Sequence, residues 1–333
     1  MGDVVYTRLG ESDLPAFRDF CREAWGKEHP LIHNAALFDY YYRRGGAINF
    51  VCAKDVATGG FLSVCGYIPA SGAPRPDVWL SFLVSRKKAP LGLSLGLIEQ
   101  IRARTGCRTL AGNNIRPRTA ALYEFFGYTV AALTQYYRIN EAVENYTICN
   151  IRYPDRLPVA PSDAVFAELT GPDMLEEFDF EAYAENQPYK DRDYVARRYF
   201  GNRFLAYRVY LGSENGRPFG LLCVRLLGYA GARAVRVVDY IGDRAKIPAC
   251  GLLLDRLLHD EGAEFCDWYA YGIPDDVMAR AGFSKRLPGD ANILPNYLEP
   301  PRMENVDFMM FTSDPQRYAM FKADGDQDRA NLG

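Results

Sequence analysis

Hydrophobic and polar positions follow the same order in the two halves of the chain. In the first half, short apolar runs bounded by turn residues predict strands. They lie at 4–9, 49–54, 60–68, 78–84, 109–111 and 130–139. Apolar residues recurring at spacings of three and four predict helices instead. These lie at 14–25, 37–44, 95–101 and 120–126. Gly106 ends the third helix, because glycine readily adopts the left-handed conformation found at helix ends.

The second half repeats this order. Strands are predicted at 165–169, 203–211, 219–227, 234–241 and 266–271. Helices are predicted at 174–183, 192–199, 247–260 and 278–283. Gly262 takes the place that Gly106 has in the first half. Self-similarity at so long a period indicates duplicated domains rather than a solenoid of short repeats.

This order of elements predicts an α/β protein with mixed sheets (α+β), built from two similar domains and an extension. Prolines interrupt any helix between 150 and 161 and mark the junction of the two domains. We therefore expect domains at 1–150 and 151–290. A C-terminal extension at 291–333 is expected to pack on the second domain.

One short segment occurs in both halves, and only one copy has a residue suited to chemistry. Residues 120–128 and 275–283 each predict a short helix that ends at a glycine and is followed by an aromatic residue. Four residues before the glycine stands Tyr123 in the first copy and Met278 in the second. A phenol can donate a proton and a thioether cannot. We therefore expect the two halves to differ in function.

The first copy fits a family motif. Positions 119–128 match Ala-x-x-Leu-Tyr-x-x-x-Gly-[Phe/Tyr], except that Thr119 replaces the alanine. This motif, together with the order of elements over 1–285, resembles the GNAT acyltransferase fold in two tandem copies. The resemblance implies an acetyl-CoA-dependent N-acyltransferase in which Tyr123 protonates the departing thiolate of the acyl-CoA. A core tyrosine on an apolar helix face is the alternative.

A second signature of the family holds the CoA pyrophosphate with backbone N–H groups and a helix N-terminus. Its pattern, Arg/Gln-x-x-Gly-x-Gly/Ala, is matched at 87–92 with Lys87 in first place. Pro90 replaces the first glycine and removes one N–H donor. The resemblance implies that acetyl-CoA is bound by this turn and by the backbone of the strand before it. The residues expected to bind it are Phe82, Leu83, Val84, Arg86, Lys87, Lys88, Leu91, Gly92 and Leu93.

The corresponding turn of the second copy, at 242–251, has lost these features. Pro248 aligns with Gly92, and Asp243 brings an anion to the place where a phosphate would bind. Because the tyrosine is replaced as well, we expect the second copy to have a substrate-binding or structural role.

Acyl transfer to an amine also needs a group, or a water relay, that removes a proton from the nucleophile. His29 lies beside Glu28 in the loop between the first two helices, and an ordinary histidine pKa suits this task. A structural or merely exposed histidine is the alternative. Asp239 is an isolated acid in an apolar strand, so it needs a partner. It either faces the site as a catalytic residue or satisfies buried backbone, and Asp77 is a weaker candidate.

Composition narrows the partners and the compartment. The chain is 48% apolar and 24% charged, and its net charge of −3 gives no reason to expect a nucleic-acid partner. We expect no membrane span and no signal peptide, since no apolar stretch is long enough for the first and the N-terminus lacks the pattern of the second. The eight cysteines form no Cys-x-x-Cys pair, and with three histidines they complete no zinc spacing. We therefore expect reduced thiols in a cytoplasmic protein without a metal site.

The acceptor class is suggested by resemblance alone. Segments at 135–140, 292–300 and 321–329 resemble parts of GNAT proteins of bacterial surface-polysaccharide pathways. This implies a small-molecule amine acceptor, an amino sugar linked to a nucleotide. An amino acid, peptide or protein amine is the alternative within the class, and a non-catalytic acyl-CoA-binding protein is the alternative outside it. A homodimer is left open.

The last of these segments carries three alternating acids, Asp324, Asp326 and Asp328. Their spacing is similar to that of a calcium-binding loop, but the glutamate that completes such a loop is missing. An acidic tail exposed to solvent is the alternative. Apolar residues at 308–311 and 318–321 would dock the chain that precedes it.

Overall fold

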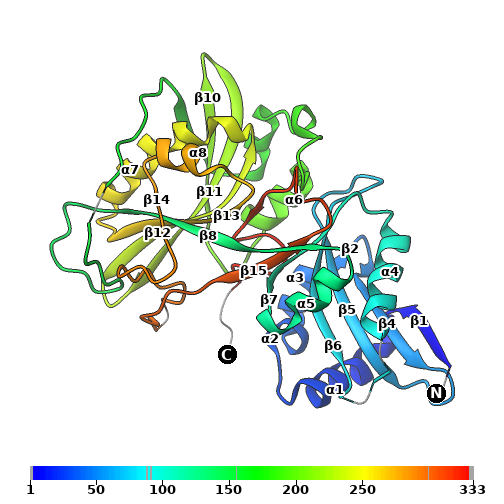
Figure 1. Cartoon of the computed structure of the whole chain (residues 1–333). Coiled ribbons are helices and arrows are strands. Elements are labelled where there is room, and N and C mark those ends of the chain that lie inside the picture. The colour runs from blue at the N-terminus through cyan, green and yellow to red at the C-terminus, as the bar shows by residue number, and fades with distance from the viewer. Residues whose placement is uncertain (1–2, 88, 91, 155, 299, 330–333) are drawn as a thin grey trace. The chain divides into compact units, whose positions relative to one another are not determined.

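The computed structural model describes residues 3–87, 89–90, 92–154, 156–298 and 300–329 (Figure 1). Its contacts divide the chain into two compact units. The first unit comprises Met1–Val130, Phe311–Asp314 and Gly325–Gly333. The second comprises Ala131–Met310 and Pro315–Asp324. The C-terminal extension is therefore shared between the units, whereas the sequence predicts that it packs on the second domain alone.

The first unit is built on a mixed sheet with the strand order β1-β4-β5-β6-β7. These strands are β1 (Val4–Arg8), β4 (Phe50–Asp55), β5 (Phe61–Pro69), β6 (Val78–Ser85) and β7 (Leu110–Ile115). Neighbours run antiparallel except for β6 and β7, which are parallel. The end of β15 (Phe308–Thr312) lies beside β7, and the Ser313 N–H that follows it donates to the Leu110 carbonyl at 2.9 Å.

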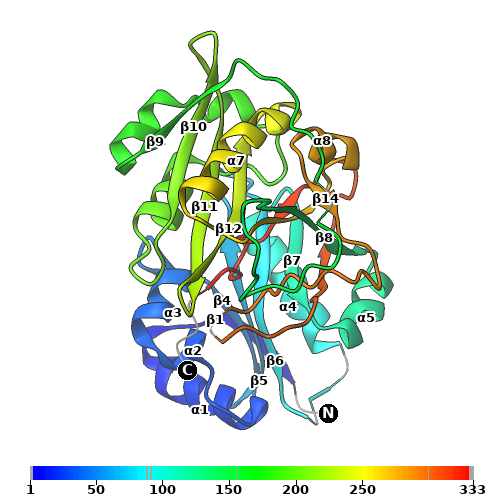
Figure 2. The ribbon, with the colours of Figure 1, turned by 90° about the vertical axis from the view of Figure 1, so that its left-hand side faces the viewer.

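Helices cover both faces of this sheet (Figure 2). One face carries α1 (Leu14–Trp25), α2 (Pro30–His33) and α3 (Ala35–Tyr42), and the other carries α4 (Leu93–Thr105) and α5 (Ala120–Phe125). Successive side chains of a strand point to opposite faces of the sheet. Side chains of β4 therefore contribute to the hydrophobic core on each face. Phe50 packs on Phe17 of α1 with ring centroids 5.0 Å apart, whereas Val51 belongs to the core formed with α4.

The second unit repeats this plan with the strand order β8-β13-β12-β11-β10-β9, in which β12 and β13 are the parallel pair. Its strands are β8 (Thr129–Ile139), β9 (Val165–Leu169), β10 (Arg208–Glu214), β11 (Arg217–Tyr229), β12 (Ala232–Gly242) and β13 (Phe265–Tyr271). Short strands β14 (Ser284–Lys285) and β16 (Met320–Phe321) pair with β8 and β13. Its helices are α6 (Arg192–Val195), α7 (Cys250–Asp260) and α8 (Asp275–Arg280).

The closing strand of the first half belongs mostly to the second unit. Its residues from Ala131 onward belong to that unit, and 134–139 pair antiparallel with β13, from Thr134↔Ala270 to Ile139↔Phe265. In the first unit, the place beside β7 is taken by 311–314 from the C-terminal extension. The compact units therefore change at residue 130 rather than near 150, because strand pairing and not the sequence repeat decides where each segment packs.

The elements predicted for the first half are present, with one difference. The helix predicted at 37–44 ends at Tyr42, because Arg43 takes extended backbone with φ −100° and ψ 120°. Arg43 then begins β2 (Arg43–Arg44), which pairs with β3 (Ala47–Ile48). Gly45 and Gly46 form the turn between them at φ 56° and 79°, a region that favours glycine.

Two elements predicted for the second half are wrong. The expected helix at 174–183 is replaced by two 3-10 helices, Pro172–Glu177 and Glu181–Tyr183, because Phe178 between them is extended. The strand expected at 203–211 begins only at Arg208. The helix at 192–199 is present as α6, followed by a π-helical turn at Ala196–Phe200. Within the described residues, no helix combines the length and apolar character needed to cross a bilayer.

Candidate active site

In the first unit, the two parallel strands β6 and β7 pair only at one end. Their register runs from Val78↔Leu110 to Leu80↔Gly112, although β6 continues to Ser85 and β7 to Ile115. A bulge on β6 accompanies the parting, because its register with β5 shifts between Cys65 and Tyr67. The backbone of Phe82, Leu83 and Val84 therefore follows the last β6–β7 pair, and it can hydrogen-bond an extended molecule as a neighbouring strand would.

Helix α4 begins close behind the end of β6. Gly92 precedes it with φ +89°, a conformation that favours glycine. The first intrahelical hydrogen bond runs from the Gly96 N–H to the Gly92 carbonyl at 3.0 Å. The N–H groups of residues 93–95 therefore have no acceptor within the helix. No side chain caps this terminus. Aligned N–H groups and the helix dipole make it a suitable site for an anion.

The basic residues of this turn differ in what they contact. Arg86 donates from Nε to the Phe61 carbonyl at 2.9 Å and lies 3.4 Å from the Glu23 carboxylate, so its head is tied to the protein. Lys87 is exposed. Leu93 is buried, and it contributes its N–H rather than its side chain to the terminus. The predicted residues Lys88 and Leu91 lie outside the described residues.

Tyr123 of α5 lies in the core of the first unit with its ring stacked on Phe311. The ring centroids are 4.1 Å apart and the planes differ by 15°. Only 6% of the residue is exposed. Burial raises the pKa of the phenol far above its ordinary value, and nearby Cys65 and Tyr128 add to this. Tyr123 is therefore protonated at neutral pH, which is the form that a proton donor needs.

His29 lies in the first unit as the residue that caps α2. Its Nδ1 accepts the Leu31 N–H at 3.3 Å, and its ring stacks on Trp25 with centroids 4.6 Å apart. Burial, with the nearby Arg329 guanidinium second, lowers the pKa of His29 to about 4. The neutral ring with Nδ1 accepting carries its proton on Nε2. These contacts give His29 a structural role, and a role as general base stays a prediction with little support.

Asp239 lies in a closed network of the second unit. Its carboxylate is fully buried, 2.5 Å from Lys190 Nζ, and it accepts hydrogen bonds from the Tyr199 hydroxyl and from the Tyr240 N–H. Lys190 also pairs with Asp324 at 2.6 Å, and burial raises the pKa of that acid. The partner that Asp239 needs is thus Lys190, as expected of an acid that satisfies buried groups. No described contact links it to a transfer site.

Asp77 is likewise fully engaged, at the start of β6 in the first unit. Its Oδ1 accepts from Thr109 at 2.6 Å, and its Oδ2 accepts from Arg108 at 2.7 Å. It fixes the loop before β7 to the start of β6 and has no feature of a base.

The C-terminal tail, residues 325–329, is mostly buried. The alternative of an acidic tail exposed to solvent is therefore wrong. Asp326, Gln327 and Asp328 are only 8%, 8% and 7% exposed. Gln327 accepts a hydrogen bond from Asn114, which follows the parting on β7 with φ 57°. No local pattern indicates that the tail reaches this part of the first unit, because Asn114 and Gln327 are 213 positions apart. No group of three or more metal-ligating side chains occurs among the described residues.

The corresponding turn of the second unit is satisfied by the chain itself. Asp243 precedes the helical segment Arg244–Ala249, and its carboxylate accepts the Ala245 N–H at 2.9 Å. This side chain supplies the negative charge that an anion would bring. Met278 takes the place of Tyr123 and is fully buried among apolar residues. The turn therefore has neither an open anion site nor a proton donor.

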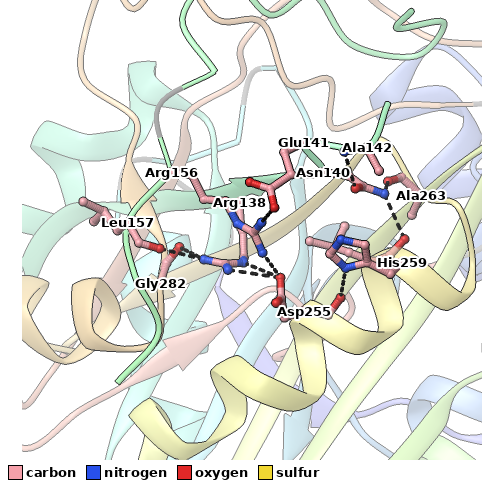
Figure 3. Close-up of polar contacts among 11 residues, drawn as sticks. Arg138, Asn140, Glu141, Ala142, Arg156, Leu157, Asp255, His259, Ala263 and Gly282 are labelled. Atoms are coloured by element: carbon pink, nitrogen blue, oxygen red, sulfur yellow. Dashed lines mark hydrogen bonds and ion pairs between the residues drawn. The ribbon is translucent and has the colours of Figure 1, made fainter. Parts of the chain in front are cut away.

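The helix–glycine segment of the second unit serves packing instead (Figure 3). Gly282, which corresponds to Gly127, accepts a hydrogen bond from Arg138 of β8 at 2.9 Å. A Cβ on Gly282 would lie 2.3 Å from the Arg138 guanidinium. Arg138 and Arg156 both reach the Asp255 carboxylate on α7, so this network joins β8, α7 and the end of the α8 segment.

The parting of strands is present in the second unit too, but it is filled. β12 and β13 pair only from Ala234↔Phe265 to Val237↔Trp268. Beyond that point β16 pairs with β13 at Ala270↔Phe321, and the Ala323 N–H donates to the Val238 carbonyl at 2.9 Å. The chain's own backbone thus occupies the gap between the parting strands of the second unit.

Comparisons with known proteins identify the fold. No protein-family model and no curated protein matches the sequence. Among solved structures, one described as a probable N-acyltransferase from Enterococcus faecalis has a TM-score of 0.55 at 12% identity, covering 95% of this chain and 73% of that one. A GCN5-related N-acetyltransferase from Anabaena variabilis has a TM-score of 0.55 at 9% identity, over 93% and 72%. One from Kribbella flavida has 0.51 at 11% identity, over 93% and 71%.

These likenesses establish the GNAT fold for this chain and confirm the fold class predicted from the sequence. The internal repeat of sheet order and parallel pair shows that the fold occurs twice.

We predict that His29 stays neutral well below neutral pH. The unfolded chain protonates it near 6.5, whereas the folded protein does so only at a pKa of about 4. Between these values the unfolded state binds more protons, so the contribution of His29 to stability is lost as the pH falls through this window. An NMR titration of the ring nitrogens and urea unfolding at several pH values check this, with His29→Asn as the control. A midpoint near 6.5 would contradict it.

Proposed function

We propose that the protein is an acetyl-CoA-dependent N-acyltransferase with its transfer site in the first unit. The observation that carries this proposal is the parting of β6 and β7 beside the N-terminus of α4, which no described side chain caps. The structures with the same fold are named as N-acetyltransferases or as a probable N-acyltransferase. Within the described residues, the first unit combines strands that part, a helix N-terminus without a side-chain cap and a buried phenol on α5.

Each of these features has a task in binding acetyl-CoA. The N–H groups at the start of α4 hold the pyrophosphate, with Lys87 adding charge at the turn. The backbone of Phe82, Leu83 and Val84 aligns the pantetheine arm by strand-like hydrogen bonds. The thioester then reaches the point where the strands part. An extended arm fits this gap because its amides repeat the donor and acceptor pattern of a peptide.

The reaction is a direct transfer. The amine nitrogen attacks the thioester carbonyl carbon, the C–S bond breaks, and the thiolate of CoA takes a proton from the Tyr123 hydroxyl. Before this attack the acceptor ammonium has lost one proton to water, which gives the nitrogen its lone pair. The neutral amine loses a second proton as the amide forms, and that proton returns through water to the tyrosinate. Tyr123 is a candidate for this role because its phenol carries a proton at neutral pH.

For the acceptor we propose an amino sugar linked to a nucleotide. Support comes from the resemblance of 135–140, 292–300 and 321–329 to polysaccharide-pathway enzymes. An amino acid, peptide or protein amine is the second candidate within the same class. A non-catalytic acyl-CoA-binding protein would keep the anion site and the open gap without needing Tyr123.

Tyr123→Phe tests the chemistry. Without a proton donor for the leaving thiolate, we expect the turnover number to fall about 100-fold with little change in KM for acetyl-CoA. Steady-state kinetics by free-thiol release measure both constants. The matched control is Tyr128→Phe, which removes a phenol from the same core. An unchanged turnover number for Tyr123→Phe would remove this residue from the mechanism.

The number of bound acetyl-CoA molecules tests the location of the site. Because the gap and the turn of the second unit are occupied by the chain itself, we expect one molecule per chain in titration calorimetry. Lys87→Ala should weaken binding about 10-fold, as expected for one charged contact. Lys246→Ala, in the corresponding turn of the second unit, should leave it unchanged. Two equal sites per chain would overturn the assignment.

A panel of amines tests the acceptor class. We expect the highest kcat/KM for a nucleotide-linked amino sugar, because the resembling segments belong to enzymes of that kind. Free-thiol release is measured with such sugars, amino acids and short peptides, and with no amine as the blank. If only amino acids or peptides are acylated, the acceptor is an amine of that class and not an amino sugar. Binding of acetyl-CoA without transfer to any amine would favour the non-catalytic alternative.

A further inference from the structure

The C-terminal segment 325–329 lies across the two parting strands of the first unit. Gly325 packs against β6, where a Cβ would come within 3.3 Å of the Trp79 side chain. Gln327 contacts β7, since its Oε1 accepts a hydrogen bond from Asn114 Nδ2 at 3.0 Å. Trp79 pairs with Ala111 just before the last β6–β7 pair, and Asn114 follows that pair. Asp326, between Gly325 and Gln327, is therefore held where the strands separate.

The Asp326 carboxylate is buried there but not saturated. Its Oδ1 accepts from Gln327 Nε2 at 2.9 Å, and its Oδ2 accepts from Arg329 at 3.1 Å. A carboxylate oxygen can accept two hydrogen bonds, so each oxygen has capacity for another donor beyond these described partners. The Arg329 side chain is 32% exposed and sits on the solvent side of this pair.

The two aromatic rings near Asp326, those of His29 and Tyr42, do not offer a negative charge to a ligand. The Asp326 carboxylate contributes to the pKa of both His29 and Tyr42, so the two rings are its neighbours. Tyr42 shares a hydrogen bond with Ser81 of β6 at 2.7 Å. His29 is neutral at pH 7 with its Nδ1 already accepting a backbone N–H. The nearest acid at the start of β6, Asp77, is engaged by Arg108 and Thr109.

We propose that Asp326 binds the ammonium group of the acceptor and holds it at the parting of β6 and β7. An unreacted amine is a cation at neutral pH, and a cation entering a buried site needs an anionic partner. Asp326 is the carboxylate that the tail brings to the point where the thioester emerges. This inference rests on the proposed N-acyltransferase function and names its acceptor-binding residue.

The experiment compares KM values for the amine that the wild-type protein acylates best in the panel. Loss of a charged hydrogen bond in Asp326→Asn should raise the KM for the amine about 10- to 100-fold and leave the KM for acetyl-CoA unchanged. Asp326→Glu, which keeps the charge, should recover most of the loss. Asp328→Asn is the matched control, because it removes the same charge from the same buried tail.

Two further comparisons separate binding from folding. Arg329→Gln removes the cation that competes for Asp326, so the KM for the amine should fall, whereas a purely structural pair would leave it equal or raise it. Thermal unfolding of each variant shows whether the tail still folds. An amine KM for Asp326→Asn within twofold of the wild type, or a rise matched by Asp328→Asn, would overturn the inference while leaving the proposed function standing. Absence of transfer by the wild-type protein would instead overturn the function, and the inference with it.

Discussion

The site depends on two parallel strands that pair over only part of their length. Buried backbone N–H and C=O groups need hydrogen-bond partners. Where two strands part, a third extended chain between them can supply these partners. In the second unit, the backbone of 320–323 supplies them. In the first unit, β6 and β7 do not pair beyond Leu80 and Gly112. The proposed position of the pantetheine arm follows from this difference.

In the second unit, internal contacts occupy the positions that correspond to the proposed site of the first unit. Asp243 caps the turn, Met278 fills the core, and the Gly282 carbonyl is held by Arg138. Beneath the filled gap, Lys190 pairs with the buried carboxylates of Asp239 and Asp324, so its charge is balanced where water is excluded. The fold alone therefore does not assign chemistry to both units.

The C-terminal extension serves both units through successive segments. Residues 315–324 belong to the second unit, and 325–329 return to the first. The Lys190–Asp324 pair and the strand β16 anchor the chain just before it changes units. A short tail anchored in this way pays less entropy on ordering than a free end would. This is a physical reason why Asp326 can act as a fixed part of a site although it lies close to the end of the chain.

The sequence by itself determined most of the elements, the duplication and the asymmetry between Tyr123 and Met278. These follow from local periodicity and from glycines at helix ends, such as Gly106 and Gly127, which take the positive φ that such ends require. Only the tertiary structure decided the exchange of strands, the buried pairing of Asp239 and the place of the tail. The reason is physical: those features arise from contacts between residues far apart in the sequence, 49 positions for Lys190 and Asp239 and 213 for Asn114 and Gln327. No local pattern encodes which distant strand or cation a segment will meet.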